Sequence, residues 1–102
     1  MVLKHEYGEL YYHKIDGKWY IESIYVNPKH RNEGVGSWLM NVAIRRCGRP
    51  ILLYATNEMG SNLKRLKGFY ERFGFESVKQ PRHNTYPYKY NMILEKWPNP
   101  VK

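Results

Sequence analysis

The chain has a single cysteine, Cys47, and no long apolar run. One cysteine cannot form an internal disulfide, and one thiolate cannot by itself build a zinc site. No stretch approaches the roughly 20 apolar residues that a membrane-spanning helix needs, and the first ten residues lack the apolar core of a signal peptide. We therefore expect a cytoplasmic protein with no metal and no membrane partner.

Acidic residues are also few, since nine Asp and Glu face seventeen Lys and Arg, which gives a net charge of +8. This charge favours a polyanionic partner, either a phosphate-rich cofactor or a nucleic acid. The basic residues are spread along the chain, which argues against a dedicated nucleic-acid-binding arm. With 102 residues, 42% of them apolar, residues 1–102 should form one compact domain with a loose tail at 98–102.

Strands joined by a tight turn are expected near the start of the chain. Asp16-Gly17 is a strong turn signal, so residues 9–26 should form a hairpin, and the first few residues should pair as a further strand. Trp19–Val26 is almost entirely apolar, aromatic or β-branched, which is typical of a strand buried on both faces. We interpret it as the central strand.

A helix and a parallel strand should follow this central strand. An apolar stripe that includes Val35, Trp38 and Leu39 predicts a helix that ends at Cys47. Ile51–Thr56 reads as the next strand. Because a helix connects the two strands, they should be parallel and joined by a right-handed crossover.

A second helix is expected after a short loop, with Asn57 or Ser61 as its cap and Gly74 as its left-handed stop. Two final strands should lie near residues 75–80 and 88–94, with a polar loop between them. The pattern as a whole predicts a mixed α/β fold with two main helices.

The loop between the central strand and the first helix has the features of an anion site. It places Gly34 and Gly36 where the helix begins, so that bare backbone N–H groups and the positive end of the helix dipole can converge on a phosphate. Arg31 adds a fixed charge at the rim. A Walker loop is excluded because no lysine stands between Gly36 and Ser37, and a dinucleotide fingerprint is excluded because Leu39 occupies its third glycine position.

Two motifs resemble those of the GNAT superfamily of N-acetyltransferases. The first is R-x-x-G-x-G, from Arg31 to Gly36, after a strand that ends in V-x-P. The second is a helix that carries an aromatic pair, Phe69-Tyr70, and ends at Gly74-Phe75. The resemblance covers about residues 9–95 and implies a mostly antiparallel sheet with a central parallel strand pair.

The resemblance implies that acetyl-CoA is the co-substrate. In the family, pantetheine pairs with the backbone of the central strand and the pyrophosphate binds the loop amides. The residues that correspond here are Ile24, Tyr25 and Val26 in the strand, Arg31, Asn32, Glu33, Gly34, Val35, Gly36 and Ser37 in the loop, and Asn62 in the second helix.

The reaction implied is direct attack of a primary amine on the acetyl thioester. In the family the tyrosine of the aromatic pair lies beside the cofactor sulfur, so Tyr70 is the expected donor to the departing thiolate. Glu22 is the candidate base, since an alternating strand would put it on the same face as Ile24 and Val26, although a structural ion pair would explain it equally well. We expect His5 and His13 to be structural.

The sequence departs from the family pattern ahead of the hairpin, where most members carry a strand and two helices that form much of the acceptor site. Their absence suggests a bulky acceptor, such as a protein, a peptide or a nucleic-acid-linked amine, or a homodimer that completes the site. Asn62 is one residue further from Tyr70 than is usual. The alternative function is a non-catalytic GNAT-like module that binds protein or nucleic acid through its basic surface.

Overall fold

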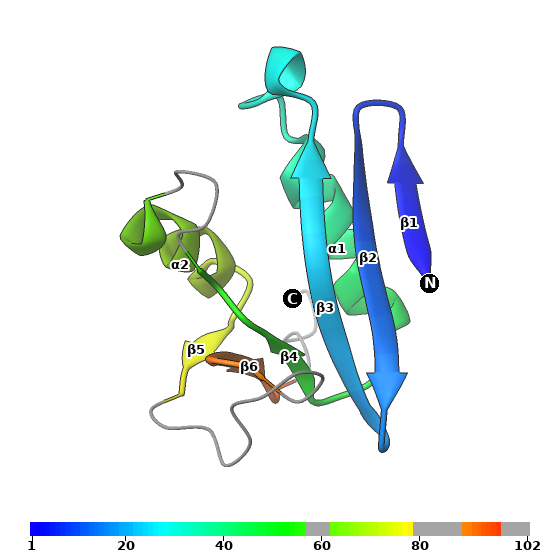
Figure 1. Cartoon of the computed structure of the whole chain (residues 1–102), viewed down its shortest axis with the longest axis vertical. Coiled ribbons are helices and arrows are strands. Elements are labelled where there is room, and N and C mark those ends of the chain that lie inside the picture. The colour runs from blue at the N-terminus through cyan, green and yellow to red at the C-terminus, as the bar shows by residue number, and fades with distance from the viewer. Residues whose placement is uncertain (57–61, 79–88, 97–102) are drawn as a thin grey trace, which may run out of the picture.

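The computed structural model describes residues 1–56, 62–78 and 89–96, which form one six-stranded sheet and two α-helices (Figure 1). The strand order is β1-β2-β3-β4-β6-β5, and every neighbouring pair is antiparallel except β3 and β4, which are parallel. This confirms the mixed, mostly antiparallel sheet. In chain order the elements are β1 (Val2–His5), β2 (Gly8–Ile15), β3 (Lys18–Val26), the short 3₁₀ helix η1 (Pro28–His30), α1 (Val35–Arg46), β4 (Ile51–Leu53), α2 (Leu63–Glu71), β5 (Glu76–Ser77) and β6 (Met92–Leu94).

The expected hairpin is present, with β2 and β3 joined at Asp16 and Gly17. Both turn residues have positive φ, 49° and 79°, which is the backbone conformation that a two-residue hairpin turn requires. The first residues form β1, which extends the hairpin to three strands. Because these contacts are between neighbours in sequence, local turn chemistry was enough to predict this half of the sheet.

The prediction that β3 is buried on both faces is wrong. Only Tyr20 and Ile21 are buried, and the residues after them are half-buried or exposed. The reason is that β3 pairs with β4 only over Trp19 to Ile21, so that its second half has β2 on one side and no strand on the other within the described chain. The second half of β3 has a neighbouring strand on one side only, so its side chains are less buried than those of a central strand.

Helix α1 packs behind β1, β2 and β3 in the view of Figure 1. Leu39, Met40 and Ala43 are fully buried in the same apolar cluster as Leu10 and Tyr12. This confirms the helix and most of its stripe, but Trp38 is 47% exposed and lies outside the core. None of the helices in the described residues is long and apolar enough to cross a membrane.

Strand β4 is shorter than Ile51–Thr56, because its pairing with β3 ends at Leu53. After that the chain leans away from β3 towards α2 (Figure 1). The backbone groups of Ala55 bond instead to the side chain of Asn91, which accepts from the N–H at 2.8 Å and donates to the carbonyl oxygen at 2.7 Å. The sheet therefore opens between β3 and the segment that follows β4.

Asn62 is the N-cap of α2, and its side chain accepts from the Arg65 N–H at 3.2 Å, so the predicted cap at Asn57 or Ser61 is wrong. Gly74 has a φ of 98° and ends the helical turn as expected. The two final strands are shorter than predicted, at Glu76–Ser77 and Met92–Leu94. The expected loops at 57–61 and 81–87 and the tail at 98–102 lie outside the described residues.

Candidate functional site

A groove of about 490 Å³ lies where the end of β3, the start of α1 and the helix α2 meet. It collects most of the residues that the sequence pointed to for a cofactor, together with Phe69 of α2 and Arg72, which follows that helix. The residues that line it are Ile24, Val26, Arg31, Asn32, Gly34, Val35, Gly36, Ser37, Phe69 and Arg72. Two motifs far apart in the sequence therefore form two walls of one groove.

The N-terminal end of α1 opens into this groove. Gly34 is the N-cap, with a φ of 84°, and no side chain caps the helix. The first intrahelical bond runs from the Trp38 N–H to the Gly34 carbonyl oxygen, so the N–H groups of Val35, Gly36 and Ser37 have no acceptor within the helix. No acidic residue stands in the first helical turn. These groups and the helix dipole favour an anion here.

Two arginines reinforce this preference from opposite walls. Arg31 stands just before the loop, and Arg72 lies at the end of α2, with its guanidinium carbon 5.5 Å from the centre of the Phe69 ring. The loop also contains a carboxylate, that of Glu33, which lies 3.2 Å from Nδ1 of His30. Glu33 is not in the lining of the groove, whereas Arg31 and Arg72 are, so the groove suits a phosphate group.

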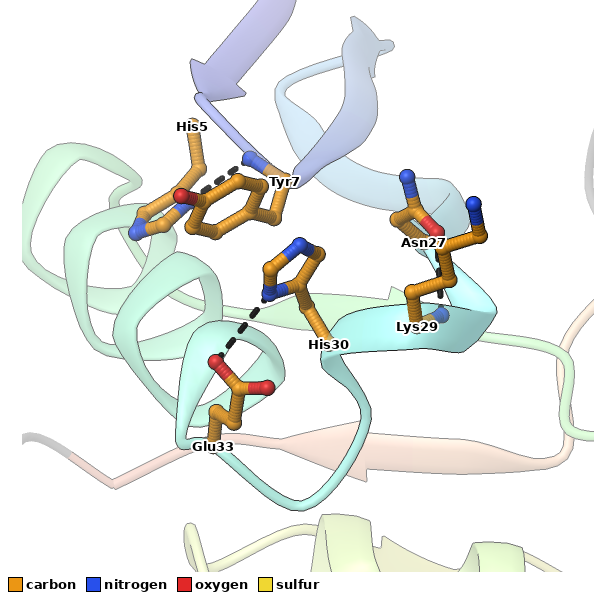
Figure 2. A network of polar contacts seen from close by, with 6 residues as sticks. All are labelled: His5, Tyr7, Asn27, Lys29, His30 and Glu33. Atoms are coloured by element: carbon orange, nitrogen blue, oxygen red, sulfur yellow. Dashed lines mark hydrogen bonds and ion pairs between the residues drawn. The ribbon is translucent and has the colours of Figure 1, made fainter.

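The loop is held by contacts with the turn between β1 and β2, as Figure 2 shows. The rings of Tyr7 and His30 stack with their centres 3.6 Å apart and their planes within 10° of parallel. Tyr7 also donates its backbone N–H to Nδ1 of His5, and its carbonyl oxygen accepts from the Asn27 N–H at 2.8 Å. No sequence signal linked these residues, because the contact depends on the register of the sheet.

The free edge of β3 forms the floor of the groove. Ile24 and Val26 line it and pack against the core. The side chain of Tyr25 is 53% exposed and belongs to a different hollow, beside His5 and Asn27. Because alternate backbone groups of a strand point to opposite sides, half of those after Ile21 point towards the unpaired edge.

Tyr70 is buried beside the groove rather than in its lining. Its ring meets Phe69 edge-on, with centres 5.4 Å apart, and meets Phe75 in the same way at 6.2 Å. Burial raises the pKa of the Tyr70 hydroxyl to about 12. The group is therefore a neutral hydrogen-bond donor at physiological pH.

Glu22 does not share a face with Ile24 and Val26, so that expectation is wrong. Tyr11 pairs with Ser23 and Tyr12 with Ile21, so Glu22 is the extra residue of a β-bulge and the alternation shifts there. Its carboxylate lies 3.7 Å from Nδ1 of His13, on the face of the sheet opposite α1.

A second cavity, of about 160 Å³, opens on that opposite face. It lies where the pairing between β3 and β4 ends, and it brings Glu22 and His13 together with two tyrosines and a lysine. The residues that line it are His13, Tyr20, Ile21, Glu22, Leu53, Tyr54 and Lys89. His13, which we expected to be structural, thus faces a cavity beside the candidate base.

Asn62 caps α2 and does not line the groove. Within residues 1–56, 62–78 and 89–96, no group of three or more His, Cys, Asp or Glu side chains is arranged to hold a metal ion. The groove contains most of the candidate cofactor residues, and the cavity contains the candidate base.

Comparison with known proteins gives one family and a set of structural relatives. The model of the acetyltransferase (GNAT) domain matches residues 2–77. A protein of the GNAT family from Bacteroides thetaiotaomicron is 27% identical to this chain, with a TM-score of 0.64, over 88% of this chain and 55% of that one. No curated protein matches the sequence.

Two further solved structures differ in how much of their own length this chain covers. Naa50 from Arabidopsis thaliana, in complex with the bisubstrate analogue CoA-Ac-MVNAL, is 25% identical, with a TM-score of 0.58, over 85% of this chain and 63% of that one. The anti-CRISPR protein AcrVA5 is 22% identical, with a TM-score of 0.67, over 91% of this chain and 94% of that one. The chain thus spans little more than half of the first relative but nearly all of AcrVA5, whose likeness shows the fold alone.

Proposed function

The chain belongs to the GNAT acetyltransferase family, and from this premise we propose that it binds acetyl-CoA in the groove and transfers the acetyl group to a primary amine. The observation that carries the proposal is the groove itself. It joins an uncapped helix N-terminus, two arginines and an unpaired strand edge in one place. Those three features suit the two chemical parts of coenzyme A, its phosphates and its amide-containing pantetheine arm.

The phosphates would bind at the start of α1. The N–H groups from Gly34 to Ser37 can each donate to a phosphate oxygen, and Arg31 and Arg72 can pair with the charge. The amides of pantetheine would then bond to the free edge of β3 at Ile24 to Val26, as an added strand does. Asn32 and Glu33 would contribute through their backbone, since the carboxylate of Glu33 lies against His30.

The amine nitrogen would attack the thioester carbonyl carbon, forming the amide bond as the carbon–sulfur bond breaks. The leaving group is a thiolate, whose conjugate thiol has a pKa of about 8.5 in a model side chain. Because the pKa of Tyr70 is about 12, full proton transfer from Tyr70 to sulfur is uphill. We infer that Tyr70 stabilises the thiolate as a hydrogen-bond donor.

The acceptor would enter from the opposite face, through the cavity beside Glu22 and His13. An alkylammonium must lose a proton before it attacks, and the Glu22 carboxylate supplies a base there, with His13 at 3.7 Å able to relay the proton. The cavity lies at the last residues that β3 and β4 share, Ile21 and Leu53, next to the gap that the acetyl group would reach.

Release of free coenzyme A thiol from acetyl-CoA, measured with a panel of lysine-containing peptides and small amines, tests this function. We expect amine-dependent release that falls roughly 10²-fold or more in Glu22→Gln, as for loss of a general base. Tight, amine-independent binding with no thiol release would favour the alternative, a binding module that has kept the fold. In that case binding to nucleic acid should weaken steeply with salt.

A further inference from the structure

The acceptor cavity already contains a primary amine, that of Lys89. Its Nζ atom lies 4.2 Å from the centre of the Tyr54 ring, and both residues line the cavity with Glu22 and His13. An ammonium over a tyrosine face is held by the ring quadrupole, which is the way proteins recognise alkylammonium ligands. The chain thus places one of its own lysine side chains in the same cavity as the carboxylate proposed as the base.

The chain next to Lys89 is bonded to the segment that follows β4. Two residues later, Asn91 bonds through its side chain to both backbone groups of Ala55, and its own N–H donates to the Leu53 carbonyl oxygen at 3.0 Å. These bonds tie the segment that carries Lys89 to the segment that carries Tyr54. The lysine is therefore brought to the cavity by three hydrogen bonds next to it in sequence.

We propose that Lys89 is an acetylation site of this chain, modified by the chain itself when acetyl-CoA is bound and no other amine fills the cavity. This rests on the proposed function. Glu22 takes a proton from the Lys89 ammonium, the Nζ lone pair forms a bond to the acetyl carbon, and the carbon–sulfur bond breaks. The products are N-acetyl-lysine and the free thiol of coenzyme A, and no other reactant is needed.

The cavity has room for the product. Its volume of about 160 Å³ is several times the roughly 30 Å³ that one water molecule occupies, so an acetyl group fits beside the lysine. The neutral amide loses the attraction between the ammonium and the Tyr54 ring. A single turnover would therefore change which amine the cavity can hold.

Lys14 provides a matched control. Its Nζ atom also lies over an aromatic ring, that of Trp19, at 5.5 Å. Lys14 is not in the lining of the cavity, and in β2 it alternates with His13, so it lies on the other face of the sheet. Spontaneous chemistry with acetyl-CoA would label both lysines, whereas the proposed reaction labels Lys89.

The test is to incubate the purified chain with acetyl-CoA alone and to measure intact mass and peptide masses over time. We expect the mass of one acetyl group to appear at Lys89, to be lost in Lys89→Arg and to be kept in Lys14→Arg. The rate constant should not change with protein concentration, because the reaction is within one molecule. In Glu22→Gln it should fall by roughly 10²-fold or more.

Calorimetric titration of the same samples with acetyl-CoA distinguishes a failure of Lys89 acetylation from a failure of the proposed function. Binding and turnover on a peptide amine without label at Lys89 would overturn this inference and leave the proposed function standing. Equal labelling of Lys14 and Lys89, or a rate that rises with protein concentration, would also overturn it. If the chain did not bind acetyl-CoA, both the Lys89 inference and the proposed function would be wrong.

Discussion

The side chain of Asn91 pairs with both backbone groups of Ala55, at 2.8 and 2.7 Å. It does for this residue what a neighbouring strand does elsewhere in a sheet. Ala55 comes directly after Tyr54, which lines the cavity. Because Ala55 is satisfied in this way, the chain after β4 has no need to pair with β3. The proposed cofactor site needs the free edge of β3, and the Asn91 side chain is what leaves this edge unpaired.

Replacing Asn91 should destabilise the fold and close or distort this edge. In Asn91→Ala the N–H and carbonyl of Ala55 lose their partners, and we expect the free energy of unfolding to fall by about 1–3 kcal/mol. Asn91→Asp should also be destabilising, because a carboxylate can accept from the N–H but cannot donate to the carbonyl oxygen. Urea denaturation measures both variants.

The control for this pair is Asn41→Ala, at an exposed position of α1, which should be neutral or slightly stabilising because alanine has the higher helix propensity. If Asn91→Ala were as stable as Asn41→Ala, the two hydrogen bonds to Ala55 would not be what holds this segment.

The stack between Tyr7 and His30 should contribute to the affinity of the proposed cofactor loop for acetyl-CoA. An aromatic pair of this kind contributes about 0.5–1.5 kcal/mol, so His30→Ala should weaken acetyl-CoA binding by roughly three- to tenfold through a less ordered loop. His30→Phe keeps a ring over Tyr7 but removes the contact with Glu33, and it should recover most of the affinity. Equal losses in the two variants would assign the effect to Glu33 instead.

The buried hydroxyl of Tyr70 should make the fold sensitive to alkali. The folded chain keeps the Tyr70 proton up to a pKa of about 12, whereas the unfolded chain loses it above the ordinary value of 10.0. Stability from this group is complete below pH 10.0 and declines as the pH rises to 12, by about 3 kcal/mol in all. The free energy of unfolding of the wild type should therefore fall relative to that of Tyr70→Phe over that range.

Thermal denaturation between pH 9 and 12 measures the Tyr70 effect, with Tyr25→Phe as the control because its side chain is 53% exposed. If the melting temperatures of Tyr70→Phe and Tyr25→Phe changed with pH in the same way, the Tyr70 hydroxyl would not be buried in the folded chain.

The parts of the structure that the sequence predicted are those set by local chemistry. The Asp16-Gly17 turn specifies the hairpin, and the glycines at 34 and 36 mark the loop that opens α1. What the sequence did not predict depends on pairing between distant segments. The bulge that moves Glu22 to the other face reflects the register of β2 and β3, and no propensity signals an extra residue within an apolar run.

The same reason explains the residues that were missed at the site. Arg72 and His13 are ordinary polar residues in their own elements, and they reach the groove and the cavity only because distant elements pack together. The early end of β4 follows from Asn91, which is far away in the sequence. Local patterns thus identified the loop to which we assign the cofactor, while the proposed acceptor cavity required the folded chain.

The central claim, that the groove holds acetyl-CoA, is tested most directly by calorimetric titration of Gly36→Ala against Gly68→Ala. A Cβ at Gly36 would lie 3.5 Å from the Phe69 ring and 3.7 Å from Val26, inside the groove but without a clash, whereas a Cβ at Gly68 meets no atom within 4 Å. We predict that the wild type and Gly68→Ala bind acetyl-CoA alike and that Gly36→Ala binds at least tenfold more weakly. Equal binding by all three proteins would contradict the account.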